Sequence, residues 1–261
     1  MDSRRNLKRK LRNREKIFGA WVSFAHPSIT EIFVHIGVDF LAIDMEHSTI
    51  DQAQAQRIIA ACQGQGVPCL PRSVSHGNEM IKPLLDSGAD GMIVPMVSTL
   101  EELNQITALC KFPSQGKRSF GVSRAQGYGF YFDEYVKTWN ETSSLVIQIE
   151  SQDGVKNIEK LVAHDAVDGV MIGPYDLSGS LGVPGQIHHP LVAGAAEKVI
   201  KVCARYGKAC GTHLVDVDQQ SIEQAFTSGY TFVILSSDLF VLWKWGERTR
   251  ELIVQYKKSL Q

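Results

Sequence analysis

The 261-residue sequence predicts an α/β protein folded as a single (β/α)8 barrel, also called a TIM barrel. Short runs of β-branched and aliphatic residues recur, and each run is followed by a longer segment of helical periodicity. The chain length is also close to the roughly 250 residues typical of one such barrel. An open doubly wound sheet is the alternative, but no Gly-x-Gly-x-x-Gly follows the first strand to support a dinucleotide site. We therefore take residues 1–261 as one domain.

The domain begins with a basic segment, residues 1–16, that we expect to form an N-terminal helix. Such a cluster of Lys and Arg can indicate an arm that binds nucleic acid or a membrane. Leu7, Leu11 and Phe18 instead form a weak apolar stripe, which favours a helix lying against the barrel. No secretory h-region or membrane span follows it. With a net charge of -1, the chain has no global attraction to polyanions, and we expect neither nucleic acid nor membrane as a partner.

Eight strands are expected in order along the chain, with a helix after each. Asp51 predicts the N-cap of a helix that runs to Gly64, and Thr99 with Glu102 predicts a capping box before another helix. Glycines that precede strands, such as Gly88, are typical of helix ends because glycine accepts the left-handed conformation there. The strands are placed near residues 19–24, 40–44, 68–71, 91–95, 145–150, 169–173, 209–212 and 232–235.

The connection between the fourth and fifth strands, residues 111–142, is unusually long. We expect a helix over residues 133–140 within it. Because long connections in compact domains often have a function, this segment is either a surface excursion or a lid over the substrate. The sequence leaves both interpretations open.

The five cysteines form no Cys-x-x-Cys pair and have no zinc-type spacing. Such cysteines are typical of small apolar core residues in a reducing compartment. We therefore expect a cytoplasmic protein without a disulfide framework.

Two carboxylates, Glu150 and Asp176, follow the fifth and sixth strands. The chemistry of a (β/α)8 barrel lies at the carboxyl ends of its strands, and neighbouring strands are about 5 Å apart. Two carboxylates in an enclosed site are costly unless a cation or a proton lies between them. Oxygen ligands without clustered histidines or cysteines favour Mg²⁺ or Mn²⁺. The structural alternative is that Glu150 pairs with an arginine and Asp176 caps the following helix.

Asp44, His47 and Arg72 follow the second and third strands at the same rim. The planar guanidinium of Arg72 suits a carboxylate or an oxyanion, although a salt bridge to Asp44 or Glu46 is the plain alternative. His47 has acidic neighbours that can orient its ring, so it is a candidate acid/base rather than only a solvated loop residue. No strand end offers a lysine for a Schiff base, which disfavours covalent catalysis.

The segments that carry these residues resemble the HpcH/HpaI aldolase/citrate lyase family of class II, pyruvate-type aldolases. The likeness extends over about residues 19–238, and the matching segments occur in the family's order. The Gly-Pro-Tyr-Asp-Leu-Ser sequence at 173–178 is the most specific of them. The others are Ile-Asp-Met-Glu-His at 43–47, Pro-Arg at 71–72 and Gln-Ile-Glu at 148–150.

The resemblance implies a metal-dependent class II aldolase that cleaves or forms a 4-hydroxy-2-oxo acid. Pyruvate or a close 2-oxo acid would supply the enolate, and an aldehyde would be the other partner. Glu150 and Asp176 would hold the metal, which would be Mg²⁺ or Mn²⁺, with Co²⁺ as a further candidate. This agrees with the chemistry expected from the residues themselves, because cleavage leaves negative charge on the pyruvate fragment.

The resemblance also assigns roles to the remaining site residues. Arg72 would stabilise the enolate, and His47, tuned by Asp44, would act as acid/base on the aldol hydroxyl. Further residues would bind the 2-oxo acid, namely Gln148, Gly173, Pro174 and Ser178.

The family implies a homohexamer, built as a trimer of dimers, in which the C-terminal helix is exchanged between subunits. The large apolar residues at 239–245 are compatible with such an exchange. Two segments depart from the family pattern, namely Arg-Ser at 118–119 and Gly-Thr-His at 211–213. Both segments lie where the aldehyde partner would be selected, so they leave the identity of the aldehyde more open than the type of reaction.

Two other functions remain open from the sequence. One keeps the fold and the metal but catalyses another reaction of a metal enolate, either 2-oxo acid decarboxylation or C–C bond addition. The other is a non-catalytic barrel that binds or assembles. Metal-dependent release of pyruvate would separate the aldolase from both.

Overall fold

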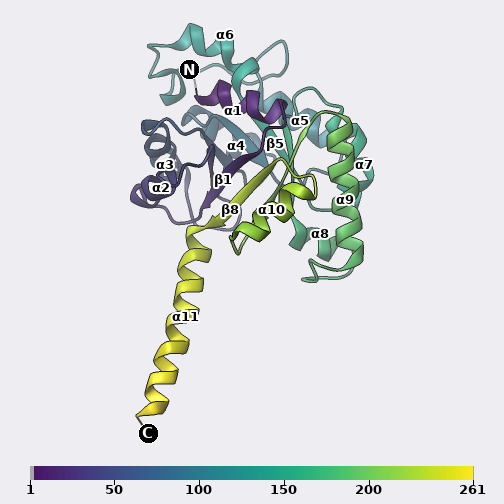
Figure 1. Cartoon of the computed structure of the whole chain (residues 1–261). Coiled ribbons are helices and arrows are strands. Elements are labelled where there is room, and N and C mark those ends of the chain that lie inside the picture. Colours follow the sequence, from purple (N-terminus) through teal and green to yellow (C-terminus); the bar gives the residue numbers. More distant parts are fainter. Residues whose placement is uncertain (1–2, 261) are drawn as a thin grey trace.

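The computed structural model describes residues 3–260, which include a closed barrel of parallel strands in the order β1 to β8 (Figure 1). The predicted (β/α)8 fold is confirmed. Residues 1, 2 and 261 of the predicted domain lie outside the described range. The strands are β1 Ile17–Val22, β2 Phe40–Asp44, β3 Cys69–Arg72, β4 Gly91–Val94, β5 Ser144–Ile149, β6 Gly169–Ile172, β7 Ala209–Leu214 and β8 Phe232–Ser237.

Each predicted strand overlaps an observed one, and differences of two residues occur in three of them, since β1 begins and ends two residues before its predicted range and β7 and β8 end two residues after theirs. The ladder between β7 and β8 continues through His213, which pairs with Ile234, to Leu214, which pairs with Leu235, and β8 reaches Ser237 through its pairing with Trp21 of β1. The prediction stopped where the apolar run ended. The extension places His213 inside β7, at the mouth of the barrel.

Helices follow the strands and cover the outside of the barrel (Figure 1). The two predicted caps are confirmed, because Asp51 with Gln54 and Thr99 with Glu102 each form a complete capping box. Gly88 has the expected left-handed conformation, with φ of +100°. These helices are α2 Pro27–Val34, α3 Gln52–Gly64, α4 Asn78–Asp86, α5 Leu100–Cys110, α7 Gln152–Val162, α8 Pro174–Ser180, α9 Pro190–Arg205 and α10 Gln219–Thr227.

The basic N-terminal segment forms α1, Ser3–Arg12, which closes the amino-terminal end of the barrel. Leu7 and Leu11 are buried and belong to the same apolar cluster as the side chains inside the barrel. The helix therefore lies against the barrel as predicted. Phe18, the third residue of the predicted stripe, belongs instead to β1.

The long connection, residues 111–142, lies beside α1 at the amino-terminal end of the barrel (Figure 1). It contains a short 3-10 helix, Arg124–Gln126, and α6, Phe132–Thr142, where a helix was predicted. Thr142 accepts a hydrogen bond from Arg4 of α1 at 3.0 Å. The segment is therefore a surface excursion and not a lid over the carboxyl ends of the strands.

The C-terminal helix α11, Asp238–Ser259, points away from the barrel as a single projecting rod (Figure 1). Its base is fixed to β1, because the carboxylate of Asp238 accepts hydrogen bonds from the amides of Ser23 and Phe24. No helix within residues 3–260 combines the length and hydropathy needed to cross a bilayer. All five cysteines are buried free thiols.

Candidate active site

A pocket of about 330 Å³ lies at the carboxyl ends of the strands, at the end of the barrel opposite α1. In a (β/α)8 barrel this end carries the catalytic groups. The structure brings nearly all the predicted site residues together here, namely Asp44, His47, Arg72, Gln148, Glu150, Gly173, Pro174 and Asp176.

Glu150 is the buried carboxylate of this pocket, with an exposed fraction of 3%. Its Oε1 accepts a hydrogen bond of 2.6 Å from the amide of Met96, and its Oε2 accepts one of 3.1 Å from the amide group of Gln148. Burial raises the pKa of Glu150 to about 7, and the negative charges of Glu46 and Asp176 add to this effect. Within residues 3–260, Glu150 forms no ion pair with an arginine, so the alternative suggested by the sequence is not realised.

Two backbone positions shape the surroundings of Glu150. Met96 has a left-handed φ of +55°, which is rare for a residue with a side chain and is characteristic of functional sites. A Cβ atom at Gly173 would lie 2.3 Å from Oε2 of Glu150, so only glycine leaves room for the carboxylate. The end of β6 is thus shaped to fit a side chain from β5.

Asp176 lies in the first turn of α8 and lines the pocket with an exposed side chain. The N-cap of α8 is Gly173, and no side chain caps this helix through a hydrogen bond. The capping alternative for Asp176 is therefore not realised either. Its carboxylate faces the site closely enough to raise the pKa of both Glu46 and Glu150.

The carboxylates of this pocket suit a hard divalent cation. Asp44, Glu150 and Asp176 line the pocket with one arginine, Arg72, and burial of excess negative charge is costly. Oxygen donors of this kind match Mg²⁺ or Mn²⁺. Within residues 3–260 no group of three or more His, Cys, Asp or Glu side chains is arranged to hold a metal ion.

Arg72 is held rigidly in the wall of the pocket. Its Nε and Nη2 both donate to Oδ1 of Asp44, at 3.1 and 2.6 Å, and its Nη1 lies 3.0 Å from Oε2 of Glu46. The guanidinium also lies over the ring of Trp21, 4.7 Å from its centroid, and Nη1 donates to Oε1 of Gln148 at 3.4 Å. The salt bridges that the sequence suggested therefore exist, and they orient the arginine within the site.

His47 lies at the rim, and its acidic neighbour is not the predicted one. Asp44 contacts His47 through the backbone amide and not through the ring, whereas Nε2 of the ring lies 3.8 Å from Oε2 of Glu46. The acidic side chain beside the ring of His47 is therefore Glu46 and not the predicted Asp44, although the sequence places both at this rim. Asp44 is occupied by Arg72 because their strands, β2 and β3, are paired at these two residues.

Ser178 does not line the pocket, although it was predicted to bind substrate. It is fully buried, and its hydroxyl donates to the carbonyl of Tyr175 at 2.6 Å and accepts from the amide of Gly185 at 2.9 Å. Its role is thus to join α8 to the loop that follows.

His213 is a pocket residue whose role the sequence did not reveal, beyond a departure from the family pattern at 211–213. Its ring lies 5.6 Å from that of Phe240, and its Nε2 has no hydrogen-bond partner among the described residues. Burial, followed by the charge of Arg72, lowers the pKa of His213 to about 4. It therefore presents a neutral imidazole in the wall of the pocket.

Known proteins similar to this chain share its fold and most of its length. The model of the family described as HpcH/HpaI aldolase/citrate lyase matches residues 17–244. A hydroxypyruvate/pyruvate aldolase of Roseobacter denitrificans is 36% identical over 244 residues, which are 92% of this chain and 94% of that protein. A 5-keto-4-deoxy-D-glucarate aldolase of Klebsiella pneumoniae is 33% identical over 241 residues, 92% of each chain. The crystal structure of a HpcH/HpaI aldolase/citrate lyase family protein from Burkholderia cenocepacia has a TM-score of 0.88 at 30% identity, covering 95% of this chain and 99% of that one.

Proposed function

Because the chain belongs to the HpcH/HpaI aldolase/citrate lyase family, and so to the carbon–carbon lyases, we propose that it is a metal-dependent class II aldolase of 4-hydroxy-2-oxo acids. It would cleave the bond between C3 and C4 to give pyruvate, or a close 2-oxo acid, and an aldehyde, and it would form that bond in the reverse direction. The observation that carries this proposal is the pocket that combines Glu150 and Asp176 with Arg72. The similarity to proteins named as pyruvate-type aldolases supports it.

The carboxylates would hold the metal, which we propose to be Mg²⁺ or Mn²⁺, with Co²⁺ as a further candidate. When bound, such an ion supplies a Lewis acid for the oxygens of a 2-oxo acid. The amides of Met96 and Gln148 fix both oxygens of Glu150, so its orientation is set before any ligand arrives. Asp176, being exposed, completes the pair from the solvent side.

Arg72 would stabilise the negative charge that develops on the 2-oxo acid as the bond breaks. Asp44, Glu46 and Trp21 hold its guanidinium in place, which reduces the reorganisation needed in the transition state. Gln148 and the backbone at Gly173 and Pro174 would define the position of the 2-oxo acid between Arg72 and the carboxylates.

His47 would act as the acid/base. In cleavage it would take the proton of the C4 hydroxyl, the C3–C4 bond would break, and its electrons would pass to the enolate, which then takes up a proton to give pyruvate. His47 is exposed at the rim, where an aldehyde would leave, and its Nε2 lies 3.8 Å from Oε2 of Glu46.

The direct test is a screen of 4-hydroxy-2-oxo acids for release of pyruvate with Mg²⁺, Mn²⁺ and Co²⁺. Glu150→Gln and Asp176→Asn should each abolish metal-dependent turnover in a folded protein, whereas Glu197→Gln, at an exposed position on α9, should not. Full activity after treatment with EDTA would contradict the proposal. Metal-dependent decarboxylation of a 2-oxo acid without aldol cleavage would assign another reaction of the enolate, and no turnover at all would favour a binding protein.

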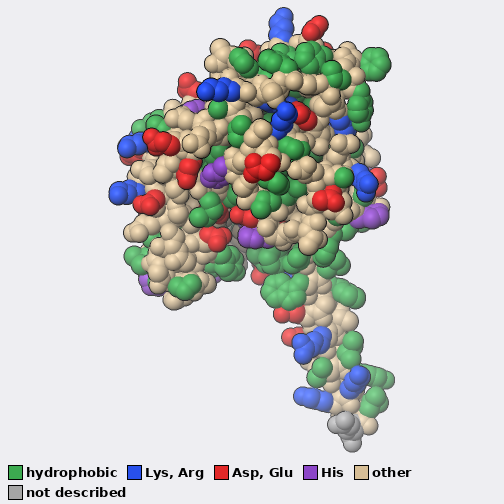
Figure 2. Space-filling view, turned by 180° about the vertical axis from the view of Figure 1, so that it is seen from behind, with side chains coloured by type: hydrophobic (Ala, Val, Ile, Leu, Met, Phe, Trp, Pro, Cys, Tyr) green, Lys and Arg blue, Asp and Glu red, His purple; other side chains and the backbone are tan. Residues whose placement is uncertain are grey.

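We also propose that the protein is a homo-oligomer in which α11 packs against a second copy. Asp238 is the one buried residue of α11, and hydrophobic side chains lie along the projecting helix (Figure 2). A lone helix with this much exposed apolar surface is unfavourable in water, whereas a second copy would cover it. The exposed apolar residues are Leu239, Val241, Leu242, Trp243, Trp245, Leu252, Ile253, Val254, Tyr256 and Leu260.

The family resemblance favours a hexamer, a trimer of dimers, and light scattering on the purified chain would measure its mass. Substitution of Trp243 and Trp245 by Glu should yield smaller species. A monomeric wild type would contradict the proposed oligomer but would leave the proposed aldolase reaction unaffected.

A further inference from the structure

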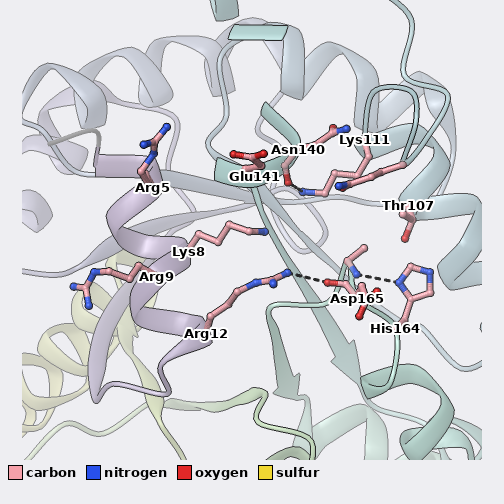
Figure 3. A pocket seen from close by; sticks show the side chains of 12 residues that line it. Arg5, Lys8, Arg9, Arg12, Thr107, Lys111, Asn140, Glu141, His164 and Asp165 are labelled. Atoms are coloured by element: carbon pink, nitrogen blue, oxygen red, sulfur yellow. Dashed lines mark hydrogen bonds between the residues drawn. The ribbon is translucent and has the colours of Figure 1, made fainter. Parts of the chain in front are cut away.

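A second cavity lies at the amino-terminal end of the barrel, far from the candidate active site, and the proposed aldolase chemistry makes no use of it. It has a volume of about 650 Å³ and lies between α1, α5, α6 and the turn before β6 (Figure 3). Its lining is predominantly basic. The cationic residues are Arg5, Lys8, Arg9, Arg12 and Lys111, and the acidic ones are Glu141 and Asp165.

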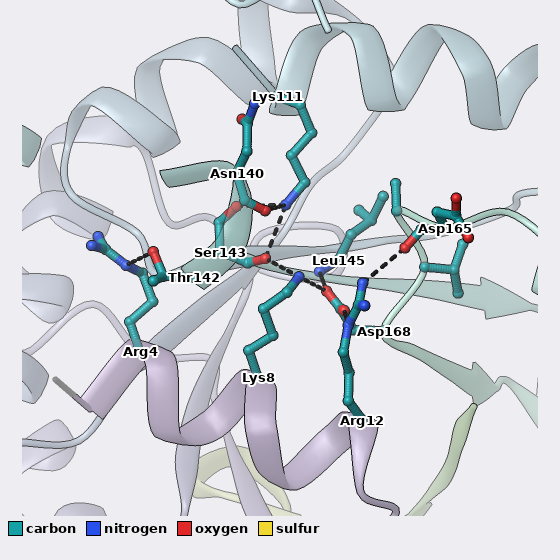
Figure 4. A network of polar contacts seen from close by, with 12 residues as sticks. Arg4, Lys8, Arg12, Lys111, Asn140, Thr142, Ser143, Leu145, Asp165 and Asp168 are labelled. Atoms are coloured by element: carbon teal, nitrogen blue, oxygen red, sulfur yellow. Dashed lines mark hydrogen bonds and ion pairs between the residues drawn. The ribbon is translucent and has the colours of Figure 1, made fainter. Parts of the chain in front are cut away.

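The floor of this cavity is a buried network with more cations than anions (Figure 4). Lys8 and Lys111 have exposed fractions of 7% and 1%. Their ammonium groups donate to the same acceptor, the carbonyl oxygen of Ser143, at 2.8 and 2.9 Å. The one buried carboxylate in contact with them is Asp168, which accepts from Lys8 at 2.8 Å and from Nε of Arg12 at 2.7 Å.

Buried positive charge without a matching anion is unfavourable. Burial lowers the pKa of Lys111 to about 7, and the charge of Lys8 is the next largest cause. Burial also lowers the pKa of Lys8, against the opposing effect of Asp168. A negative charge in the cavity would relieve both effects, so the electrostatics of the floor favour an anionic ligand.

Hydrogen-bond donors remain available around this cavity. Lys8 is already engaged, because it donates to Ser143 and Asp168 and shares a side-chain hydrogen bond with Lys111. Arg12 donates through Nε to Asp168 and through Nη2 to the carbonyl of Asp165, and within residues 3–260 its Nη1 has no acceptor. Arg5 is exposed and makes no hydrogen bond or ion pair in the part of the chain that the structure describes.

We propose that this cavity binds a compact dianionic oxyanion, either inorganic phosphate or the phosphoryl group of a small metabolite, through Arg5, Lys8 and Arg12. Guanidinium forks match the tetrahedral oxygens of such a group, and Lys8 adds a point charge from below. The basic N-terminal helix then forms one wall of a small-molecule site rather than an arm for a polyanion. A nucleic acid or a membrane would need an open surface rather than a cavity.

The site has a direct structural connection to the candidate active site. Ser143 immediately precedes β5, and Asp168 immediately precedes β6; Glu150 and Asp176 follow the other ends of the same two strands. An anion in the cavity would stabilise the network that holds the starts of β5 and β6 together. Occupancy should therefore raise the stability of the folded protein, whatever reaction the enzyme catalyses.

Calorimetric titration and thermal unfolding with inorganic phosphate, against NaCl at equal ionic strength and pH 7, test the proposal. Wild type should show saturable binding with one site and a rise in Tm that follows the occupancy. Arg5→Gln should weaken binding about tenfold, which is the effect of one charge-assisted contact, without changing the Tm of the phosphate-free protein. Lys8→Met should weaken it further. Arg57→Gln, an exposed arginine on α3, is the matched control and should bind as wild type.

Arg72→Gln separates this cavity from the candidate active site. If phosphate binding is lost in Arg72→Gln and kept in Arg5→Gln, the ion binds at the carboxyl ends of the strands and the proposal is overturned. The proposal is also overturned if phosphate binding does not saturate, or if NaCl at equal ionic strength raises Tm as much as phosphate does. Arg5 is exposed, so Arg5→Gln should fold normally. This variant therefore tests the proposal even if Lys8→Met does not fold. Tighter binding of ribose 5-phosphate than of inorganic phosphate would identify a metabolite as the ligand, and equal binding would identify the free ion.

Discussion

A Cβ atom on Gly173 would lie 2.3 Å from Oε2 of Glu150, so the carboxylate occupies the space that any larger residue at position 173 would fill. The two residues come from adjacent strand ends, and β5 and β6 are paired up to Ile149 and Ile172, the residues before them. The amide of Met96 holds the opposite oxygen of Glu150. The carboxylate is thus fixed by backbone from β4 and β6 together.

Gly173→Ala should displace the carboxylate of Glu150. The new methyl group cannot be accommodated at 2.3 Å, so Glu150 must rotate away from Met96. We expect metal affinity and turnover to fall at least tenfold while the fold is retained, because the φ of −97° at Gly173 suits any residue. A metal titration measures this. Gly179→Ala, in the same helix with nothing within 4 Å of the new methyl group, should bind metal as wild type; equal losses in both variants would contradict the explanation.

The raised pKa of Glu150 should make stability depend on pH. Burial raises this pKa from 4.5 to about 7, so the folded state holds the proton more tightly than the unfolded state. The resulting stabilisation is complete below pH 4.5 and is lost as the pH rises to 7. Without metal, Glu150→Gln should therefore be more stable than wild type at pH 8, by on the order of 3 kcal/mol in urea unfolding, and the difference should vanish at pH 4.5. The same difference at both pH values would show that the pKa of Glu150 is the same in the folded and unfolded states.

Arg72→Lys should impair the enzyme although it keeps the charge. A lysine offers no planar fork for the bidentate contact with Asp44 and cannot also reach Glu46 and stack on Trp21. We expect kcat/KM to fall by about a hundredfold, which corresponds to about 3 kcal/mol of transition-state stabilisation. Steady-state kinetics of pyruvate release would measure this. Arg57→Lys, at an exposed position, is the matched control, and wild-type kinetics in Arg72→Lys would assign the arginine a purely electrostatic role.

His47→Ala should affect aldol cleavage more strongly than the exchange of the methyl protons of pyruvate. Loss of the acid/base should lower the rate of aldol cleavage by about 10² to 10⁴. Exchange of the methyl protons of pyruvate, followed by NMR in D₂O, should be partly retained because it depends on Arg72 and the carboxylates. The side chain is 63% exposed, so Tm should not change. Equal loss of both activities would place His47 in enolate formation instead.

Much of this site could be predicted because each residue ends an apolar run. Glu150, Arg72 and Asp44 stand where buried strands stop, and parallel strands bring such ends to one rim. The fold followed from the same alternation. The closed barrel was expected from the number and order of the strands together with the chain length and the absence of a Gly-x-Gly-x-x-Gly after the first strand.

The remaining features depend on side-chain directions that no local pattern encodes. Arg72 pairs with Asp44 and Glu46 together, where the sequence offered either one, and Met96 joins the site because its backbone turns left-handed after β4. Ser178 lies in the most specific motif of the sequence, yet its hydroxyl faces the helix interior. His213 was hidden because β7 continues beyond its apolar run.

His213→Leu should change the response to acid in the sense opposite to Glu150→Gln. Burial and Arg72 lower the pKa of His213 from 6.5 to about 4. Between these two pH values the unfolded state therefore binds a proton at His213 and the folded state does not. The stabilisation from this group is therefore complete above pH 6.5 and is lost as the pH falls towards 4. Relative to wild type, the leucine variant should gain stability on acidification, by about 1.4 kcal/mol for each pH unit between 6 and 4.5.

The two groups titrate in overlapping windows, so in wild type their opposite slopes partly cancel and only variants reveal them. Urea unfolding of Glu150→Gln, His213→Leu and the double variant from pH 4.5 to 8 would measure both. The slopes should add in the double variant if the groups titrate independently. A leucine variant whose stability follows wild type at every pH would mean that the folded protein protonates His213 as readily as the unfolded chain does, and would require a partner for its Nε2.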